Sequence, residues 1–288
     1  MGRRSLGRAV RAAALAAIAL FAFGPVSTAA PAGPPRPRRI VSLNACADQY
    51  LMALADRSQI AALTQFARDP SLSFYADRAN TYPITQGQAE AVLALRPDLI
   101  IASPYRRAET LSLLKGKVRI LDVKPAESFP DVVKETRAIA SAIGQTARGE
   151  ALIRSMQARV DAAGRRPMHG VAAHYQRGGF ITGPGTLMDD LMTRAGLSNL
   201  ARRGHGGSLG RLSLEQIIYA RPDFLILTDG PQAGQDEGSL SLEHPALTQA
   251  VPPARQLHLP AALTVCGGPS YPEALERLQA AADQARRR

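Results

Sequence analysis

Two stretches of this sequence, 125 residues apart, carry the same pattern. The first is AEAVLALRPDLIIAS, from Ala89 to Ser103, and the second is LEQIIYARPDFLILT, from Leu214 to Thr228. Each has a Glu, five further residues, Arg-Pro-Asp and then a run of aliphatic residues. Proline cannot continue the hydrogen-bond ladder of a helix, and a continuous aliphatic run is typical of a strand buried on both faces. The pattern therefore predicts a short helix followed by a buried strand, twice in one chain.

The elements around the two copies follow the same order. In the first half, strands are expected over residues 40–43, 60–64, 98–102 and 118–121, and helices over 47–54, 90–95 and 108–114. In the second half, a strand over 169–175 restarts the alternation and a helix over 271–286 closes it. Helices that alternate with strands in this way indicate a parallel sheet. The sequence thus predicts an α/β protein with two similar halves.

The segment between the halves has a different pattern. From residue 128 to 163 the apolar positions keep helical spacing, and Gly144 is the only weak point. We expect one long helix, or two in near-continuation, with a length of about 45–50 Å at 1.5 Å per residue. Such a helix suits a rigid connection between two lobes.

The first thirty residues have the features of a secretory signal peptide. Four arginines precede the apolar run Ala12–Phe23, which is too short to span a bilayer. The small residues Ser27, Thr28 and Ala29 then offer a cleavage site for a signal peptidase. We expect cleavage near Ala29 and a periplasmic protein; the alternative is an N-terminal membrane anchor. The route of export, general secretory or twin-arginine, stays open. Residues 31–39 form a Pro-rich leader that we expect to be extended.

The charge balance argues against a nucleic-acid partner. The formal net charge is +11, and removal of the signal peptide, with its four Arg and no acidic residue, lowers it by four to +7. The remaining Lys and Arg do not form a stripe interleaved with aromatic residues, which is the usual mark of nucleic-acid binding.

The chain resembles the periplasmic substrate-binding proteins of ABC importers for iron chelates and vitamin B12. The resemblance covers nearly all of residues 39–286 and rests on RIVSLNACADQYLMALA, AEAVLALRPDLIIAS, AIGQTARGEALI, TGPGTLMDDLMTRAG, LSLEQIIYARPDFLIL and HPALTQA. It implies two Rossmann-like lobes with central parallel sheets, joined by a long rigid α-helix, with the ligand in the cleft between the lobes. We expect an N-terminal lobe over 40–127, the connecting helix over 128–163 and a C-terminal lobe over 164–288.

The same resemblance implies a binding protein that performs no catalysis and has no resident cofactor. The expected ligand is a metal chelate, either cobalamin or another corrinoid or a ferric siderophore, with haem as the alternative. The expected partner is the membrane permease of the importer, and we expect a monomer. Two other classes compete. One is an exported hydrolase that uses Cys46 with a histidine, and the other is a docking protein without a small ligand.

Two glutamates are candidates for docking to the permease. In the resembled family, a Glu on the surface of each lobe binds Arg-lined pockets of the permease, and the matching positions are Glu90 and Glu215. Carboxylate–Arg pairs are strong and directional. The alternative is purely local, since a Glu at a helix N-terminus is already favoured by the helix dipole.

Ligand contacts are expected where parallel strands end, at their carboxyl edges. The candidates are Asn44, Cys46, Phe66, Arg68, Tyr105, Arg106, Tyr175, Phe180, His205 and Cys266. The aromatic residues offer flat faces, and the two arginines suit ligand carboxylates or phosphate. The five histidines do not cluster, so a receptor for a free metal ion is not expected. An axial ligand to haem iron would come from His174, Tyr175 or His205.

Cys46 and Cys266 are the only cysteines, and they fall in different predicted lobes. Three interpretations stay open. They form a disulfide across the lobes, they are paired thiols that contact a metal or chelate, or they are separate thiols. A disulfide requires Cα atoms within roughly 7 Å of each other.

Overall fold

The structure is a computed structural model that describes residues 36–287, except 104–107, 205–206 and 230–239. The predicted signal peptide and most of the Pro-rich leader lie outside these residues. Among the helices that are described, none is both long and apolar enough to cross a membrane.

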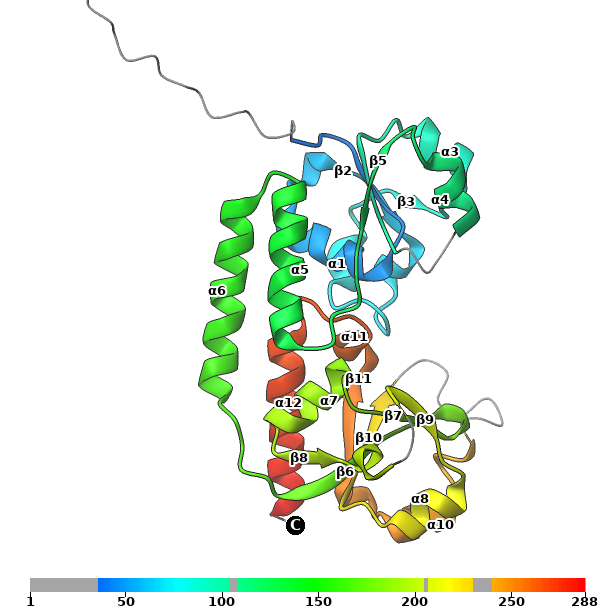
Figure 1. The fold of residues 1–288 in the computed structure, drawn as a ribbon, viewed down its shortest axis with the longest axis vertical. Helices are drawn as coiled ribbons and strands as arrows, with labels where there is room; N and C mark the ends of the chain where they lie inside the picture. Colours follow the sequence, from blue (N-terminus) through cyan, green and yellow to red (C-terminus); the bar gives the residue numbers. More distant parts are fainter. Residues whose placement is uncertain (1–35, 104–107, 205–206, 230–239, 288) are drawn as a thin grey trace, which may run out of the picture. The chain divides into compact units, whose positions relative to one another are not determined.

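The first sheet is wholly parallel, with the strand order β3-β2-β1-β4-β5 (Figure 1). Its strands are β1 Ile40–Ser42, β2 Ile60–Thr64, β3 Ile84–Thr85, β4 Leu99–Ala102 and β5 Arg119–Asp122. The helices of this half are α1 Ala45–Leu54, α2 Ala76–Ala79, α3 Ala89–Ala94 and α4 Ala108–Leu114. β4 is buried along its whole length, as its continuous aliphatic run predicted. The predicted parallel α/β arrangement of the first half is confirmed.

The second sheet combines the parallel strand pairs that were expected with antiparallel pairs that were not. Its order is β11-β10-β6-β7-β9, with β8 also paired to β6, and both β7 pairings are antiparallel. Its strands are β6 Gly170–Gln176, β7 Phe180–Thr182, β8 Leu197–Asn199, β9 Leu209–Arg211, β10 Phe224–Asp229 and β11 Gln256–Pro260. The reason is the connection after β6. Gly178 and Gly179 adopt φ of 68° and 78°, and this tight turn returns the chain directly as an antiparallel neighbour.

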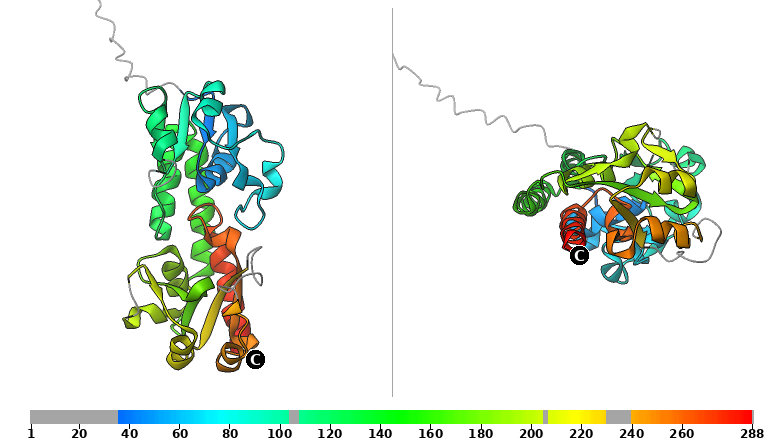
Figure 2. Two further views of the ribbon diagram at one scale, coloured as in Figure 1. Left: turned by 90° about the vertical axis from the view of Figure 1, so that its right-hand side faces the viewer. Right: turned by 90° about the horizontal axis from the view of Figure 1, so that it is seen from below.

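Five helices that lie wholly within the described residues accompany the second sheet. They are α7 Leu187–Arg194, α8 Leu214–Ala220, α10 Pro245–Ala250, α11 Ala261–Thr264 and α12 Tyr271–Arg286. The last of them, red in Figure 2, packs against α7 and against α6 (Thr146–Ala163), a helix between the two halves. The α/β class with two sheets flanked by helices is therefore confirmed, and both halves contain the predicted helix-then-strand repeat.

The two Arg-Pro-Asp copies have the same local structure. Arg221 directly after α8, and Arg96 two residues after α3, adopt left-handed φ values of 44° and 47°, and the chain leaves each helix there. The carboxylate of Asp98 then accepts the backbone N–H of Arg39, and that of Asp223 accepts the N–H of Val171. In each half the Asp thereby fastens the strand after the motif to the start of the neighbouring strand.

The connection between the halves is a helical hairpin, so the expectation of one long or nearly continuous helix is wrong. It consists of α5 Phe129–Ala142 and α6 Thr146–Ala163, which lie side by side (Figure 1). Gly144 adopts φ of 71°, so the chain reverses there. The close approach of Gly149 to Ala140, where an added Cβ would lie 2.4 Å from the alanine Cβ, lets the two helices pack tightly.

Of the two helices, α5 has buried residues in both hydrophobic cores. Its first turns bury Phe129 and Val132 with α7, α12 and the second sheet. Its later residues Ile139 and Ala140, with Ile143 just beyond the helix, are buried with α1 and the first sheet. The connecting role expected for residues 128–163 therefore falls mostly on α5, because of the two helices only α5 has fully buried residues in both cores.

Candidate ligand-binding site

A cavity of about 830 Å³ lies where strands of the first sheet end, a volume within the usual range for small-molecule sites. Its lining is Leu43, Asn44, Ala45, Cys46, Tyr50, Phe66, Leu72, Ser103, Val123, Lys124, Pro125, Ala126, Leu187, Thr264, Val265, Cys266 and Gly267. The residues up to Ala126 belong to the first half of the chain, and the others to the second half. We call this space the disulfide cavity, because the disulfide between Cys46 and Cys266 lies in its wall.

The start of α1 is positioned by Asn44. Its side-chain Oδ1 accepts the backbone N–H groups of Cys46 at 2.8 Å and Ala47 at 3.0 Å, which is the usual cap at a helix N-terminus. The three residues at this start of α1, Asn44, Ala45 and Cys46, lie on the cavity wall. Asn44 is thus a helix cap as well as a lining residue.

The two cysteines are bonded to each other in the structure, with Cα atoms 5.3 Å apart. Cys46 lies in the first turn of α1 and Cys266 follows α11, so the disulfide joins the two halves at the cavity wall. A second contact lies beside it, because the hydroxyl of Tyr50 donates to the carbonyl of Gly267 at 2.8 Å.

Much of the cavity wall is apolar and open to solvent. Phe66 from the first half is 39% exposed, and Val265 from the second half is 51% exposed. Large apolar side chains left exposed in a concave site mark a surface that a ligand or partner covers. The geometry therefore favours a ligand that presents an apolar face to both halves of the chain.

The structure separates the predicted ligand residues into groups. Asn44, Cys46, Phe66 and Cys266 meet in the disulfide cavity. Tyr105, Arg106 and His205 lie outside the described residues. The guanidinium of Arg68 donates instead to the carbonyls of Ala79 and Tyr82, which commits it to the packing of its own lobe.

Tyr175 and Phe180 line a different hollow, of about 380 Å³, where β6 ends in the second sheet. Phe180 is 43% exposed, and the guanidinium of Arg211 stands 5.7 Å from its ring centroid. Tyr175 is buried, and its hydroxyl donates to the carbonyl of Leu212 at 3.2 Å. Of the two, only Phe180 is exposed.

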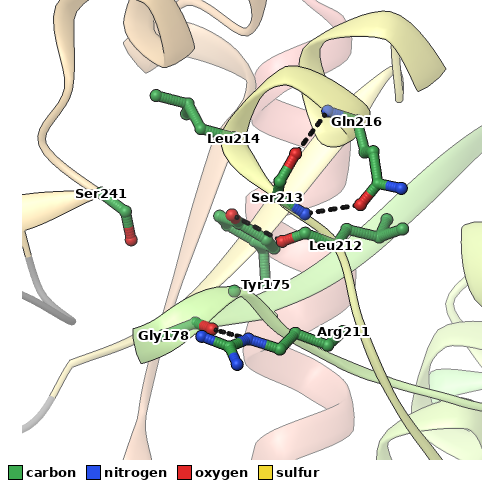
Figure 3. A pocket seen from close by; sticks show the side chains of 9 residues that line it. Tyr175, Gly178, Arg211, Leu212, Ser213, Leu214, Gln216 and Ser241 are labelled. Atoms are coloured by element: carbon green, nitrogen blue, oxygen red, sulfur yellow. Dashed lines mark hydrogen bonds between the residues drawn. The ribbon is translucent and has the colours of Figure 1, made fainter.

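A third hollow, of about 600 Å³, flanks the start of α8 (Figure 3). In Figure 3 the backbone N–H of Ser213 donates to the side-chain oxygen of Gln216, and the backbone N–H of Gln216 donates to the hydroxyl of Ser213. This reciprocal pair is a capping box that starts the helix. The Nε of Arg211 donates to the carbonyl of Gly178 in the same view. The polar groups of this hollow thus start α8 and hold the turn after β6 against β9.

His174 is not placed as an open metal ligand. Both of its ring nitrogens lie within hydrogen-bond distance of hydroxyls, Thr182 at 2.7 Å and Thr228 at 2.8 Å. Burial lowers the pKa of His174 to about 4, so the ring is neutral at physiological pH. Across the part of the chain that the structure describes, no group of three or more His, Cys, Asp or Glu side chains is arranged to hold a metal ion.

The two docking candidates occupy equivalent places. Glu90 and Glu215 are exposed and lie in the first turns of α3 and α8, at the second helical residue in each. The hydroxyl of Ser213 donates to the carboxylate of Glu215 at 2.7 Å, and this hydrogen bond lowers its pKa. Both carboxylates are therefore on the surface of the protein, one in each lobe.

Sequence reasoning missed several lining residues. Lys124 follows β5, so the rule that sites lie at the carboxyl ends of strands would have found it had it been applied to that strand. Tyr50 lies inside α1, and Leu187 begins α7. No pattern in the sequence distinguishes these two from ordinary core residues.

A family model described as "Periplasmic binding protein" matches residues 40–255. A cobalamin-binding protein of Halobacterium salinarum is 29% identical over 202 residues, which are 66% of this chain and 53% of that protein. An uncharacterized ABC transporter substrate-binding lipoprotein of Bacillus subtilis, YvrC, is 24% identical over 211 residues, 68% of this chain and 65% of that protein. The chain thus spans about half the length of the first relative and just under two thirds of the second.

Among solved structures, the periplasmic heme-binding protein RhuT from Roseiflexus sp. RS-1, in its apo form, superposes with a TM-score of 0.69 at 27% identity. The match covers 86% of this chain and 99% of that one. The similarity therefore includes both halves of the fold and the segment between them.

Proposed function

This chain belongs to the periplasmic binding protein family, and from that premise we propose that it is the substrate-binding component of an ABC importer. It captures a metal chelate of the cobalamin, haem or siderophore kind and delivers it to the membrane permease. It acts by binding alone. The single observation that carries the proposal is the disulfide cavity, because both halves of the chain contribute exposed apolar side chains to one concave site.

A corrinoid is the first candidate ligand. The supporting observation is the 29% identity to a protein named as cobalamin-binding, over two thirds of this chain. Haem is the second candidate, supported by the 27% identity to a haem-binding protein whose structure this chain matches almost throughout. A ferric siderophore remains the third. All three ligands present a broad, partly apolar chelate surface, which suits Phe66 and Val265 on the cavity wall.

Export and docking complete the proposed role. Residues 1–30 serve as the signal peptide, cleaved near Ala29, and the mature chain works outside the cytoplasmic membrane. Glu90 and Glu215 bind the permease, one from each lobe, through charge-assisted pairs with cationic side chains. Their exposure and their equivalent helix positions support this role.

Titration with a ligand panel tests the binding role. The mature protein is mixed with cyanocobalamin, haemin and a ferric hydroxamate siderophore, and binding is followed by calorimetry and by the absorbance of each chelate. One compound should bind with a Kd at or below about 1 μM and raise the Tm by several degrees, because a ligand that binds only the folded state stabilises it. If none of the three binds, the proposal fails.

The docking role has a separate test. The double variant Glu90→Lys, Glu215→Lys should abolish uptake of the bound chelate by cells while leaving the affinity of the purified protein unchanged. The matched control is Glu109→Lys, Glu243→Lys, which makes the same charge change at one exposed Glu in each lobe and should transport normally. A loss of ligand affinity in the first variant, or equal loss of uptake in both, contradicts docking through Glu90 and Glu215.

A further inference from the structure

We infer that Lys124 is a specificity-determining residue that pairs with an anionic group, a carboxylate or a phosphate, on the ligand held in the disulfide cavity. The inference rests on the proposed function and extends it to the chemistry of the ligand. Of the lining residues that the structure describes, Lys124 alone carries a formal charge. An anionic ligand group therefore meets an attractive charge on this wall and no opposing carboxylate.

Two of the other polar groups on this wall, the Oδ1 atom of Asn44 and the hydroxyl of Tyr50, have internal partners. The Oδ1 atom of Asn44 accepts two backbone N–H groups at the start of α1, and the hydroxyl of Tyr50 donates to Gly267. Arg68, which the sequence suggested for this purpose, donates to carbonyls in its own lobe. Lys124 has no carboxylate of another described residue within ion-pair distance. As far as the described residues go, its ammonium group therefore has no ion-pair partner and can pair with a ligand.

The backbone of Lys124 is held on two sides. Its N–H donates to the carboxylate of Glu135 on α5 at 3.3 Å. Two residues later Ala126 lies against Gly267, where an added Cβ would come within 2.6 Å of the alanine Cβ. A fixed backbone with an exposed side chain places the ammonium group over a restricted region of the cavity, which lowers the entropy lost when it pairs with a ligand.

Glu135 is the acidic group that competes for Lys124. It is half-buried, and burial raises its pKa, while the charge of Lys124 acts in the opposite direction. The carboxylate of Glu135 accepts the backbone N–H of Lys124. It therefore partly offsets the positive charge of Lys124 but forms no ion pair with the ammonium group. The net effect is a single cationic point beside an apolar wall. A ligand that fits it has an apolar face and an anionic edge.

Two pairs of probes separate charge from shape. Haemin carries carboxylates that its dimethyl ester lacks, and cyanocobalamin carries a phosphodiester that dicyanocobinamide lacks. The variants are Lys124→Gln, Lys124→Arg and the control Lys117→Gln, an exposed lysine outside the cavity lining. Binding is measured by calorimetry at pH 7.5 in low salt, and the Tm of each free variant checks that it is folded.

We expect Lys124→Gln to weaken binding of the anionic probe by about 10- to 100-fold, the range for a hydrogen bond to a charged group. Lys124→Arg should stay within about threefold of the wild type, and the neutral partner of the probe should bind equally to wild type and Lys124→Gln. Added salt should shrink the difference between the variants.

Three results overturn the inference. An unchanged affinity of Lys124→Gln for the anionic probe removes the role of the charge. An equal loss for the anionic and neutral probes, or for Lys117→Gln, makes the effect one of packing or of general charge. In both cases ligand binding by the wild type still stands, and with it the proposed function. Failure of the wild type to bind any probe overturns the proposed function and the inference together.

Discussion

Cys46 and Cys266 are separated by 220 residues in the chain, and their Cα atoms lie 5.3 Å apart across a disulfide. One cysteine belongs to a helix of the first lobe and the other to a segment of the second, and both line the candidate ligand cavity. Beside them, Gly267 packs so closely on Ala126 that no side chain would fit between them. The two lobes are therefore joined at the cavity wall as well as through α5.

Removal of the disulfide should destabilise the protein. The double variant Cys46→Ser, Cys266→Ser is expected to lose about 2–5 kcal/mol of unfolding free energy, because the bond closes a very long loop in the unfolded chain. The measurement is the urea midpoint of the mature protein. The wild type should show no reactive thiol until a reductant is added.

The same experiment contains its control. A dithiol reductant should lower the urea midpoint of the wild type to that of the double variant and leave the variant unchanged. If reduction exposes both thiols and the wild-type midpoint does not move, the disulfide contributes nothing to the stability of the fold.

Asp48 should make the protein less stable as pH rises from about 4 to 6. It is buried, its carboxylate accepts the N–H and hydroxyl of Thr64, and burial raises its pKa to about 6. In this window the folded protein holds a proton that the unfolded chain has released, so stability falls by an amount on the order of 3 kcal/mol. Asp48→Asn should gain stability relative to the wild type between pH 4 and pH 7. Urea midpoints at four pH values measure this, and parallel curves for the two proteins contradict it.

His174 should have the opposite effect in the second lobe. Its folded pKa of about 4 lies below the ordinary value of 6.5, because burial disfavours the charged ring. The stability it contributes is complete above pH 6.5 and is lost as the pH falls toward 4, again by roughly 3 kcal/mol.

The variant His174→Gln should therefore lose less stability on acidification than the wild type does. A constant offset between the two proteins reports only lost packing around Thr182 and Thr228, whereas a difference that grows below pH 6.5 reports the buried neutral ring. Equal slopes in this window would show that His174 titrates normally.

Gly149 should be intolerant of even one methyl group. Alanine normally stabilises a helix by about 1 kcal/mol relative to glycine, but a Cβ at this position would lie 2.4 Å from that of Ala140. We expect Gly149→Ala to destabilise the protein by about 1–3 kcal/mol, the usual effect of overpacking.

A double-mutant cycle checks the contact. Ala140→Gly should recover part of the loss caused by Gly149→Ala, with a coupling of at least about 0.5 kcal/mol. Ala158→Gly, at an exposed position of α6, has the same effect on helix propensity and should show no coupling. Additive effects of Gly149→Ala and Ala140→Gly would contradict the tight packing of α5 on α6.

Much of the fold was predictable because its signals are local. The repeat of Glu, Arg-Pro-Asp and an aliphatic run locates α3 and β4, then α8 and β10, since proline ends a helix and a doubly buried strand has no polar face. The helical hairpin was misread for a related reason. The apolar spacing of α5 and α6 is the same whether the chain continues or reverses, and only the left-handed φ at Gly144 distinguishes the two.

The site depended on contacts that no local pattern records. The sequence by itself determined the α/β class, the two similar halves and the places where strands end, and so it led to Asn44, Cys46 and Phe66. Only the tertiary structure decided that Cys266 meets Cys46, that Arg68 is committed elsewhere and that Lys124 lines the cavity. The physical reason is that secondary structure follows from neighbours a few residues apart, whereas a cavity wall joins side chains more than two hundred residues apart.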